Sequence, residues 1–273
     1  MGPLLIIGGR EDKDHHPRIL QRFIALCRQT GRPGPIGIVT TAAEDGALAY
    51  GRYAKAFAAL GVPTRPFLVW AREQADAAEV AEGLRHVAGV FFSGGDQLRI
   101  TSTLGGTVFH RRLLAERAAG LVVAGTSAGA SMMSDVMIVG GAEEAGPTKN
   151  RVQLAAGMGL WPGSVIDQHF SQRGRIGRLL AALAQNPAVL AIGIDEDTAV
   201  EVDGTGAWLT VVGSNTVTVL DGQGILATNA SESRPDQPLA LVGVRLHVLA
   251  PGWSLDLAYR RPRPPVSAPH SAS

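Results

Sequence analysis

Residues 121–131 read Leu-Val-Val-Ala-Gly-Thr-Ser-Ala-Gly-Ala-Ser, and this stretch decides the fold. Its apolar start predicts a buried strand, and the Gly-x-Ser-x-Gly pattern that follows predicts a sharp turn into a helix. The turn is so tight that its flanking positions must be nearly free of side chains, which holds Ser127 in a strained conformation with its hydroxyl exposed. Taken alone, the stretch is also compatible with an ordinary glycine-rich turn or a phosphate-binding loop. A Walker loop is excluded, because no Gly-Lys-Ser/Thr follows.

Short apolar runs alternate with helix-patterned segments on both sides of this stretch. The runs are rich in Val, Ile and Phe with little alternation, as in strands buried on both faces. They are residues 3–8, 36–41, 65–70, 89–92, 121–125, 165–167 and 191–195. The segments with apolar residues near helical spacing are 17–30, 44–60, 72–87, 107–119 and 173–184. This order predicts an α/β fold with a mostly parallel sheet and helices on both faces.

The alternation of strands and helices stops near Thr198. The stretches that follow are strand-like and have no helix between them, and Gly213-Ser214-Asn215 supplies turn residues. We therefore expect a small antiparallel extension over residues 198–259, within a single domain of residues 1–259. The tail, residues 260–273, is rich in Pro, Ser and Ala and is expected to be disordered or loosely draped over the domain.

Composition and charge exclude several classes of protein. The chain has 273 residues, of which 45% are hydrophobic, and this excludes an intrinsically disordered chain. The formal net charge is +1, so no strong field attracts nucleic acid or an anionic membrane, and neither is an expected partner. No apolar run approaches the roughly 20 residues of a membrane span. The N-terminus has no signal-peptide pattern, and a cytoplasmic location is expected.

A serine nucleophile needs a base, and the base needs a group that orients it. Among seven histidines, His169 is distinctive because it follows a predicted strand end directly. The carboxyl ends of parallel strands share one edge of a sheet, and the predicted turn at Ser127 lies at that edge. Another predicted strand ends there in three carboxylates, Asp195, Glu196 and Asp197. No Cys/His cluster has zinc-ligand spacing, and a serine triad supplies its own nucleophile, so we expect neither metal nor cofactor.

Five blocks match a known family, in order along the chain. They are residues 8–13, 91–97, 125–130, 167–178 and 193–199, and the most specific of them begins Asp-Gln-His-Phe-Ser-Gln-Arg-Gly-Arg at Asp167. With them the chain resembles the cyanophycinases, in the serine peptidase group that also contains peptidase E. The resemblance implies a class I glutamine-amidotransferase-like fold with serine at the nucleophile position. Arg10 stands where the family most often has Ala, and we expect this departure to lie away from the chemistry.

The resemblance also implies roles for individual residues. It makes Ser127 the nucleophile, His169 the general base and acid, and Glu196 the residue that orients the imidazole, with Asp195 and Asp197 as less favoured third members. The backbone N–H groups of Gly95 and Ala128 are candidates for the oxyanion hole, because a glycine lets the backbone approach a substrate carbonyl closely. The family often forms dimers, so a homodimer is expected. The glycine-rich residues 140–163 would suit an interface or an active-site flap.

The implied reaction is hydrolysis of cyanophycin, a polymer of aspartate that carries arginine on each β-carboxyl group. An exopeptidase would release β-aspartyl-arginine dipeptides through an acyl-enzyme. Each unit carries a guanidinium and a free carboxylate, which suggests carboxylate-binding arginines and guanidinium-binding acids. The candidates for substrate binding are Arg173, Arg175, Arg178, Asp167, Asp96, Gln97 and Gln168. Residues 175 and 178 share a face of a helix and 173 need not, so one or two of the arginines could be solvated surface charges instead.

Three alternatives remain beside this reading. An aspartyl dipeptidase like peptidase E would cleave short peptides with an N-terminal aspartate. A non-catalytic binding protein of the same fold would be expected to have lost a member of the triad, and all three are present. A glutaminase subunit is disfavoured, because serine occupies the position where that class needs cysteine, and Cys27, the only cysteine in the sequence, lies on a distant predicted helix.

Overall fold

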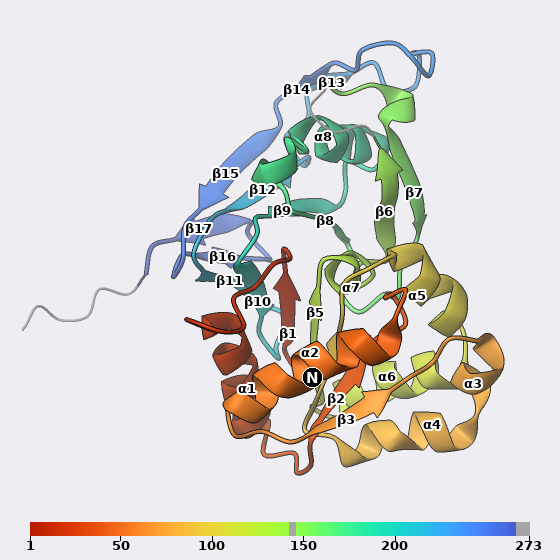
Figure 1. Ribbon diagram of the computed structural model, residues 1–273. Helices are drawn as coiled ribbons and strands as arrows, with labels where there is room; N and C mark the ends of the chain where they lie inside the picture. The colour runs from red at the N-terminus through yellow and green to blue at the C-terminus, as the bar shows by residue number, and fades with distance from the viewer. Residues whose placement is uncertain (142–145, 266–273) are drawn as a thin grey trace, which may run out of the picture.

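A computed structural model of the chain describes residues 1–141 and 146–265 (Figure 1). Within these residues, nine strands form the larger sheet in the order β17-β16-β11-β10-β1-β5-β4-β2-β3. Its parallel part consists of β1 (Leu4–Ile7), β5 (Val122–Thr126), β4 (Gly89–Phe92), β2 (Ile36–Val39) and β3 (Thr64–Phe67). Antiparallel strands extend it beyond β1, namely β10 (Thr198–Val202), β11 (Trp208–Gly213), β16 (Ser254–Asp256) and β17 (Arg261–Arg263). The predicted mostly parallel sheet with an antiparallel C-terminal extension is thereby confirmed.

A second sheet lies beside the first and has the order β15-β12-β9-β8 (Figure 1). Its strands are β8 (Ser164–Gln168), β9 (Leu190–Ile194), β12 (Val217–Asp221) and β15 (Arg245–Leu249). Strands β8 and β9 are parallel to each other, but they do not continue the larger sheet as their sequences suggested. Strands β11 and β12 follow one another in sequence but lie in different sheets, so residues 213–215 carry the chain across and do not close a hairpin.

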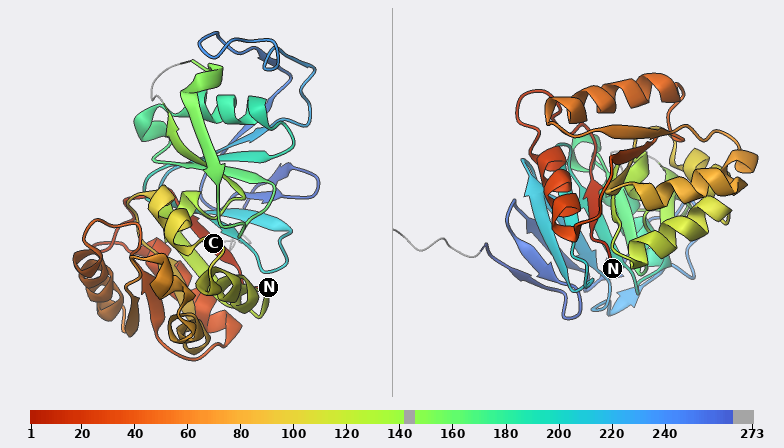
Figure 2. Two further views of the ribbon diagram at one scale, coloured as in Figure 1. Left: turned by 90° about the vertical axis from the view of Figure 1, so that its right-hand side faces the viewer. Right: turned by 90° about the horizontal axis from the view of Figure 1, so that it is seen from below.

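Helices cover both faces of the larger sheet, as predicted (Figure 2). The helical segments are α1 (Arg18–Thr30), α2 (Gly46–Ala59), α3 (Arg72–Asp76), α4 (Ala78–Glu82), η1 (Gly83–His86), α5 (Gln97–Leu104), α6 (Val108–Ala118), α7 (Ala128–Ser131), η2 (Lys149–Arg151), η3 (Ser171–Arg173) and α8 (Ile176–Gln185). The single helix predicted over residues 72–87 is broken into short pieces, because Ala77 adopts an extended backbone conformation between α3 and α4. None of the described helices is long and apolar enough to span a membrane.

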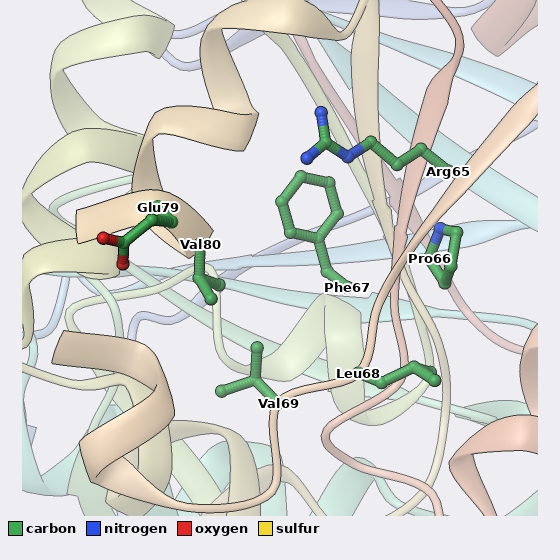
Figure 3. A pocket seen from close by; sticks show the side chains of 7 residues that line it. All are labelled: Arg65, Pro66, Phe67, Leu68, Val69, Glu79 and Val80. Carbon is green, nitrogen blue, oxygen red and sulfur yellow. The ribbon is translucent and has the colours of Figure 1, made fainter. Parts of the chain in front are cut away.

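A small cavity lies between the edge strand β3 and helix α4 (Figure 3). Its volume is about 270 Å³, and its lining comprises residues 65–69 with Glu79 and Val80. The guanidinium of Arg65 lies 5.6 Å from the centre of the Phe67 ring and closes one side. None of the residues predicted for the site lines this cavity, and we assign it no function.

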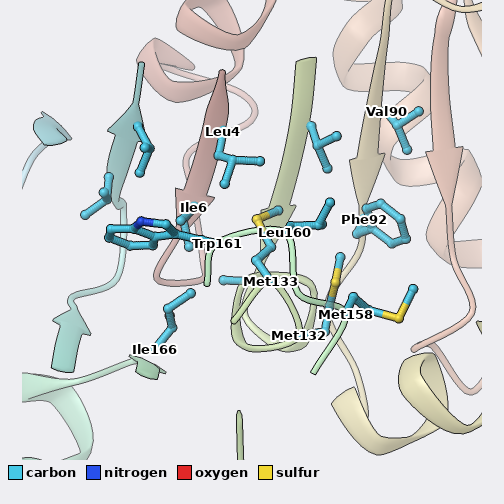
Figure 4. Close-up of a cluster of buried hydrophobic side chains, with 14 of the residues drawn as sticks. Leu4, Ile6, Val90, Phe92, Met132, Met133, Met158, Leu160, Trp161 and Ile166 are labelled. Carbon is cyan, nitrogen blue, oxygen red and sulfur yellow. The ribbon is translucent and has the colours of Figure 1, made fainter. Parts of the chain in front are cut away.

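The alternation of side chains along β1 divides the core between two faces. Leu5 and Ile7 pack with α1 and α2 on one face, whereas Leu4 and Ile6 belong to the largest buried cluster on the other. That cluster also takes in Ile166 of β8 and residues of β9 and β12, so the two sheets share one core (Figure 4). A shared core is compatible with a single domain over residues 1–259, and that division of the chain stays a prediction.

Residues 261–263 are ordered, which corrects the prediction of a disordered tail from residue 260. They pair with β16, and the Arg260 side chain donates to Asp221 at 2.5 Å and to the carbonyl of Ala188 at 2.9 Å. Residues 266–273 lie outside the described residues. Further strands are β6 (Val136–Gly141), β7 (Val152–Ala156), β13 (Ala227–Thr228) and β14 (Leu241–Val242), and the pair β6 and β7 was not predicted.

Candidate active site

The strand-to-helix turn predicted at Ser127 is present at the carboxyl end of β5. Ser127 has a φ of 53°, a left-handed value that side chains other than glycine rarely adopt, and α7 begins at the next residue. Its N–H donates to the carbonyl of Ile7 at 3.0 Å, which ties the turn to β1. A Cβ at Gly125 would be 2.2 Å from the carbonyl oxygen of Gly129, and one at Gly129 would be 2.5 Å from that of Phe92. Both flanking glycines are thus required by close backbone packing.

His169 lies where β8 ends and faces Ser127 from the second sheet. Its Nε2 is 3.0 Å from Ser127 Oγ, and its Nδ1 is 2.7 Å from Glu196 Oε1. Its backbone N–H donates to the carbonyl of Gly8 at 2.8 Å, which joins β8 to the loop after β1. The three side chains therefore meet where the carboxyl ends of strands from both sheets converge, and they have the order of a serine, a base and an orienting carboxylate.

The two carboxylates beside Glu196 have other partners. Asp195 is buried and accepts from the N–H of Ser171 at 2.9 Å and from Thr216 Oγ1 at 2.7 Å. Asp197 accepts from Ser214 Oγ at 2.6 Å. Among the three acids considered for this position, Glu196 is the one in contact with the imidazole.

The surroundings of His169 favour its neutral form. Burial lowers the pKa of the imidazole below its ordinary value, and the nearby positive charges of Arg173 and Arg175 act in the same direction. The hydrogen bond and charge of Glu196 oppose the shift but do not overcome it. A neutral imidazole at neutral pH can accept the hydroxyl proton of Ser127, as a general base must.

Arg10 contacts the site, contrary to our expectation for the position where the chain departs from the family. Its Nε lies 3.4 Å from Glu196 Oε1, while its side chain is largely exposed. The expectation was wrong because the loop after β1 brings the Arg10 side chain to Glu196. An exposed pair of this kind is weak in water, so Arg10 is expected to contribute little to holding Glu196 in place.

Asp167 and Arg178 form a pair inside the protein, although both were predicted to bind substrate. Asp167 is 1% exposed and Arg178 6%. Arg178 donates through Nε to Asp167 Oδ2 at 2.6 Å, and its Nη2 donates to the other oxygen. Both carboxylate oxygens face this guanidinium, so we propose that the pair positions the segment that carries His169 and does not contact substrate.

Arg175 and Gln168 are buried between that pair and the nucleophile. Arg175 Nη1 donates to the backbone carbonyl of Gln168 at 2.5 Å and to its side-chain oxygen at 3.2 Å. The same side-chain oxygen lies 3.4 Å from Ser127 Oγ, so Gln168 reaches the nucleophile. The Arg173 side chain is exposed, and the backbone N–H of this residue donates to the backbone carbonyl of His169 at 3.1 Å. Of the three predicted arginines, Arg173 is therefore the one placed at the surface of the site.

The loop after β4 that contains Gly94 and Gly95, called the glycine loop below, lies against Ser127. A Cβ at Gly94 would be 3.3 Å from the Cβ of Ser127, and Gly95 has a φ of +143° that brings it close to the carbonyl of Ala42. The next two residues hold elements of the fold: Asp96 caps α5 by accepting from the N–H of Leu98 at 2.8 Å, and Gln97 donates to the carbonyl of Ile138 at 2.9 Å. The oxyanion hole from Gly95 and Ala128 stays a prediction.

Glu11 is a component of the site for which the sequence suggested no role. Its buried carboxylate accepts from Thr126 Oγ1 at 2.5 Å and from the hydroxyl of Tyr53 at 2.7 Å, and Lys13 Nζ lies 2.7 Å away. Burial and the Glu11 charge together raise the pKa of Tyr53 well above its ordinary value. The network supports the residue directly before the nucleophile. In the sequence, the one indication of a role for Glu11 is its place in residues 8–13, the first of the blocks that match the family.

The described residues contain no cluster of three or more His, Cys, Asp or Glu side chains arranged to hold a metal. Cys27 lies on the buried face of α1, and burial raises the pKa of its thiol to about 12, so it has little thiolate to offer at neutral pH.

The model of peptidase family S51 matches residues 4–210. Curated relatives include the cyanophycinase of Trichormus variabilis, 38% identical over 266 residues that cover 96% of this chain and 88% of that protein. The cyanophycinase of Geminocystis herdmanii is 38% identical over 251 residues, 91% of each chain. That of Thermosynechococcus vestitus is 35% identical over 255 residues, 92% of this chain and 78% of the other.

Two solved structures share the fold. The crystal structure of a peptidase from an acI-B1 Actinobacterium superposes with a TM-score of 0.73 at 23% identity, over 94% of this chain and 97% of that one. A putative peptidase E protein from Listeria monocytogenes EGD-e gives a TM-score of 0.52 at 18% identity, over 78% of this chain and 98% of the other. The family model over residues 4–210, and curated relatives at 38% identity over more than nine-tenths of the chain, show that the chain belongs to peptidase family S51.

Proposed function

We propose that the protein is a serine exopeptidase that hydrolyses cyanophycin and releases β-aspartyl-arginine dipeptides. The observation that carries this proposal is the chain of contacts from Ser127 Oγ through the imidazole of His169 to Glu196, with separations of 3.0 and 2.7 Å. The substrate class follows from the curated relatives, which are named cyanophycinases and match at 35–38% identity.

In the proposed reaction, Ser127 Oγ attacks the carbonyl carbon of a backbone aspartyl peptide bond. His169 Nε2 takes the hydroxyl proton, and Glu196 stabilises the imidazolium through Nδ1. The N–H groups of Gly95 and Ala128 stabilise the oxyanion of the tetrahedral intermediate. The imidazolium then gives its proton to the leaving amine, and the peptide bond breaks to leave an ester on Ser127.

Hydrolysis of that ester repeats the same steps with water. His169 takes a proton from the water, whose oxygen attacks the ester carbonyl, and then returns the proton to Ser127 Oγ. The protein's own groups thus carry every proton in both halves of the reaction. Neutral His169 is needed at the start of each half, in agreement with the lowered pKa of its imidazole.

The test is to incubate insoluble cyanophycin with the wild-type chain, with Ser127→Ala and with Ser102→Ala, whose serine is exposed on α5 away from the nucleophile. Clearing of the suspension and product mass are the readouts. We expect the wild type and Ser102→Ala to release β-aspartyl-arginine as the first product and Ser127→Ala to release none. Early appearance of longer oligomers would contradict the exopeptidase assignment.

Failure of all three proteins to clear the polymer would overturn the substrate assignment. Peptides with an N-terminal aspartate would then test the peptidase E-like alternative, and tight binding of the polymer without cleavage would indicate the non-catalytic one. A homodimer and a cytoplasmic location are also part of the proposal, on the basis of the family resemblance. Light scattering after size-exclusion chromatography tests the first, and fractionation of source cells tests the second.

A further inference from the structure

A cleft beside the nucleophile is lined by charged residues that the proposed mechanism does not use. It lies between α2, Lys13 and the glycine loop and has a volume of about 590 Å³. Gly94 is part of its wall, and a Cβ at that residue would be 3.9 Å from Ser127 Oγ. We call it the α2 cleft, and the residues that matter for its chemistry are Lys13, Glu44, Asp45, Leu48, Arg52 and Gly94.

Its acidic end lies next to the glycine loop. Asp45 is the N-cap of α2, and one of its oxygens accepts from the N–H of Leu48 at 2.8 Å. Glu44 precedes it and is exposed, and within the described part of the chain its carboxylate has no hydrogen-bond or ion-pair partner. The backbone holds this end in place, because the N–H of Asp96 donates to the carbonyl of Ala42 at 2.9 Å.

The basic end lies two helical turns further along α2. Arg52 follows Asp45 by seven residues, roughly 10 Å along a helix axis, and residues seven apart lie on one face. Arg52 forms no ion pair with any residue that the structure describes. Lys13 contributes a second cation, and its Nζ is held 2.7 Å from Glu11 Oε1 and 5.0 Å from the centre of the Tyr53 ring. The same Nζ also donates to the backbone carbonyl of Glu11 at 3.2 Å, which leaves one of its three N–H donors for an anion in the cleft.

An apolar surface separates the two ends. Leu48 lies between Asp45 and Arg52 on the same face of α2, and it is 54% exposed. A cavity of about 320 Å³ shares Lys13 and Arg52 with the cleft and adds Lys55 and Asp14, so cations outnumber the one carboxylate there by three to one. From Glu44 to Arg52, the side chains along the cleft are therefore first acidic, then apolar and then positively charged.

We propose that the α2 cleft binds the arginyl branch of a substrate unit next to the scissile bond. This inference rests on the proposed function. The guanidinium of the branch pairs with Glu44 and Asp45, its methylene groups cover Leu48, and its carboxylate binds Arg52 and Lys13. The pair Asp167 and Arg178, which was predicted to recognise these two charges, is buried and satisfied internally. The cleft offers the same two kinds of charge at the surface.

The experiment measures binding to the Ser127→Ala protein by calorimetry, so that it does not depend on turnover. The ligands are a synthetic tetramer of β-aspartyl-arginine units and two analogues of it. In one analogue citrulline replaces each arginine and removes the positive charge, and in the other agmatine replaces it and removes the carboxylate. Glu44→Gln and Arg52→Gln are then added singly to Ser127→Ala, with Glu73→Gln and Arg18→Gln, both exposed on other helices, as matched controls.

We expect Arg52→Gln to raise the Kd of the natural tetramer about tenfold and that of the agmatine analogue less than twofold, because the analogue has no carboxylate to lose. Glu44→Gln should likewise raise the Kd of the natural tetramer about tenfold and that of the citrulline analogue less than twofold, because citrulline has no positive charge to lose. The inference would be overturned if a substitution raised the Kd of the natural tetramer and of its analogue equally. It would also be overturned if the control substitutions raised the Kd as much, or if the tetramer did not bind at all. The proposed function is judged separately, by turnover of the same tetramer with the wild-type chain.

Discussion

The imidazole ring of His169 lies directly against Gly9. A Cβ built on residue 9 would be 2.3 Å from Cε1 and 2.5 Å from Nε2 of the ring, well inside contact distance. Gly9 also has a φ of +104°. The loop after β1 thus leaves room for the imidazole of His169 only because residue 9 has no side chain.

Gly9→Ala should therefore displace His169 and lower kcat at least 100-fold. The left-handed backbone also costs a residue with a Cβ roughly 1–2 kcal/mol, so the free energy of unfolding should fall as well. Gly31→Ala is the matched control, because Gly31 has a φ of +69° and no atom lies within 4 Å of the position that a Cβ would take there. It should lose comparable stability in urea denaturation and keep its kcat. Equal activity of the two variants would contradict the role of Gly9.

The pH dependence of kcat/KM should report the neutral form of His169. Activity requires the unprotonated imidazole, so it should fall as the pH drops through the pKa of this residue, at a midpoint below 6.5 because burial lowers that pKa. Glu196→Gln removes an interaction that raises the pKa, so the midpoint should move to still lower pH. The plateau should also drop, by roughly 10²- to 10⁴-fold, because the imidazole loses its orienting partner.

Asp197→Asn is the control for that experiment, since Asp197 accepts hydrogen bonds from Ser214 and not from His169. Its plateau should stay within a few-fold of the wild type and its midpoint should not move. A midpoint that shifts as far as in Glu196→Gln would mean that the titration follows the general charge of this loop.

Much of the candidate site could be predicted from local sequence, because its geometry requires particular backbone conformations that only certain residues adopt. The turn at Ser127 requires glycines at 125 and 129 for close packing, and such a requirement is visible in the pattern itself. His169 is recognisable because it follows a strand end directly. The choice of Glu196 over its neighbours came from resemblance, and the structure supplies the physical reason, which is that Asp195 and Asp197 have other partners.

The directions in which side chains point could not be predicted in the same way. Helical periodicity places 175 and 178 on one face but does not say that this face is buried against Asp167. Residues 213–215 have the composition of a hairpin turn, yet the strands they join pair with different partners, β10 and β9. Both outcomes depend on contacts between segments far apart in sequence, which local pattern does not specify.

The buried pair of Asp167 and Arg178 should contribute strongly to stability. Asp167→Asn leaves the guanidinium buried without its counter-charge, which is expected to cost about 3–5 kcal/mol in the free energy of unfolding. Glu82→Gln removes the charge from solvent-exposed pairs with Arg85 and Arg112 and should cost less than about 1 kcal/mol. Urea denaturation measures both. A loss near 1 kcal/mol in Asp167→Asn would show that water reaches the pair.

Thr126 connects the nucleophile to the buried carboxylate of Glu11, and its hydroxyl donates to that carboxylate at 2.5 Å. Thr126→Val keeps the shape of the side chain but leaves a carboxylate oxygen short of one donor, at a cost of about 1–3 kcal/mol in the free energy of unfolding. The residue before the nucleophile then loses its anchor, and kcat should fall about tenfold with KM nearly unchanged. Thr126→Ser keeps the hydroxyl and should keep most of both properties. If Thr126→Ser lost as much kcat as Thr126→Val, the methyl packing and not the hydrogen bond to Glu11 would position the turn.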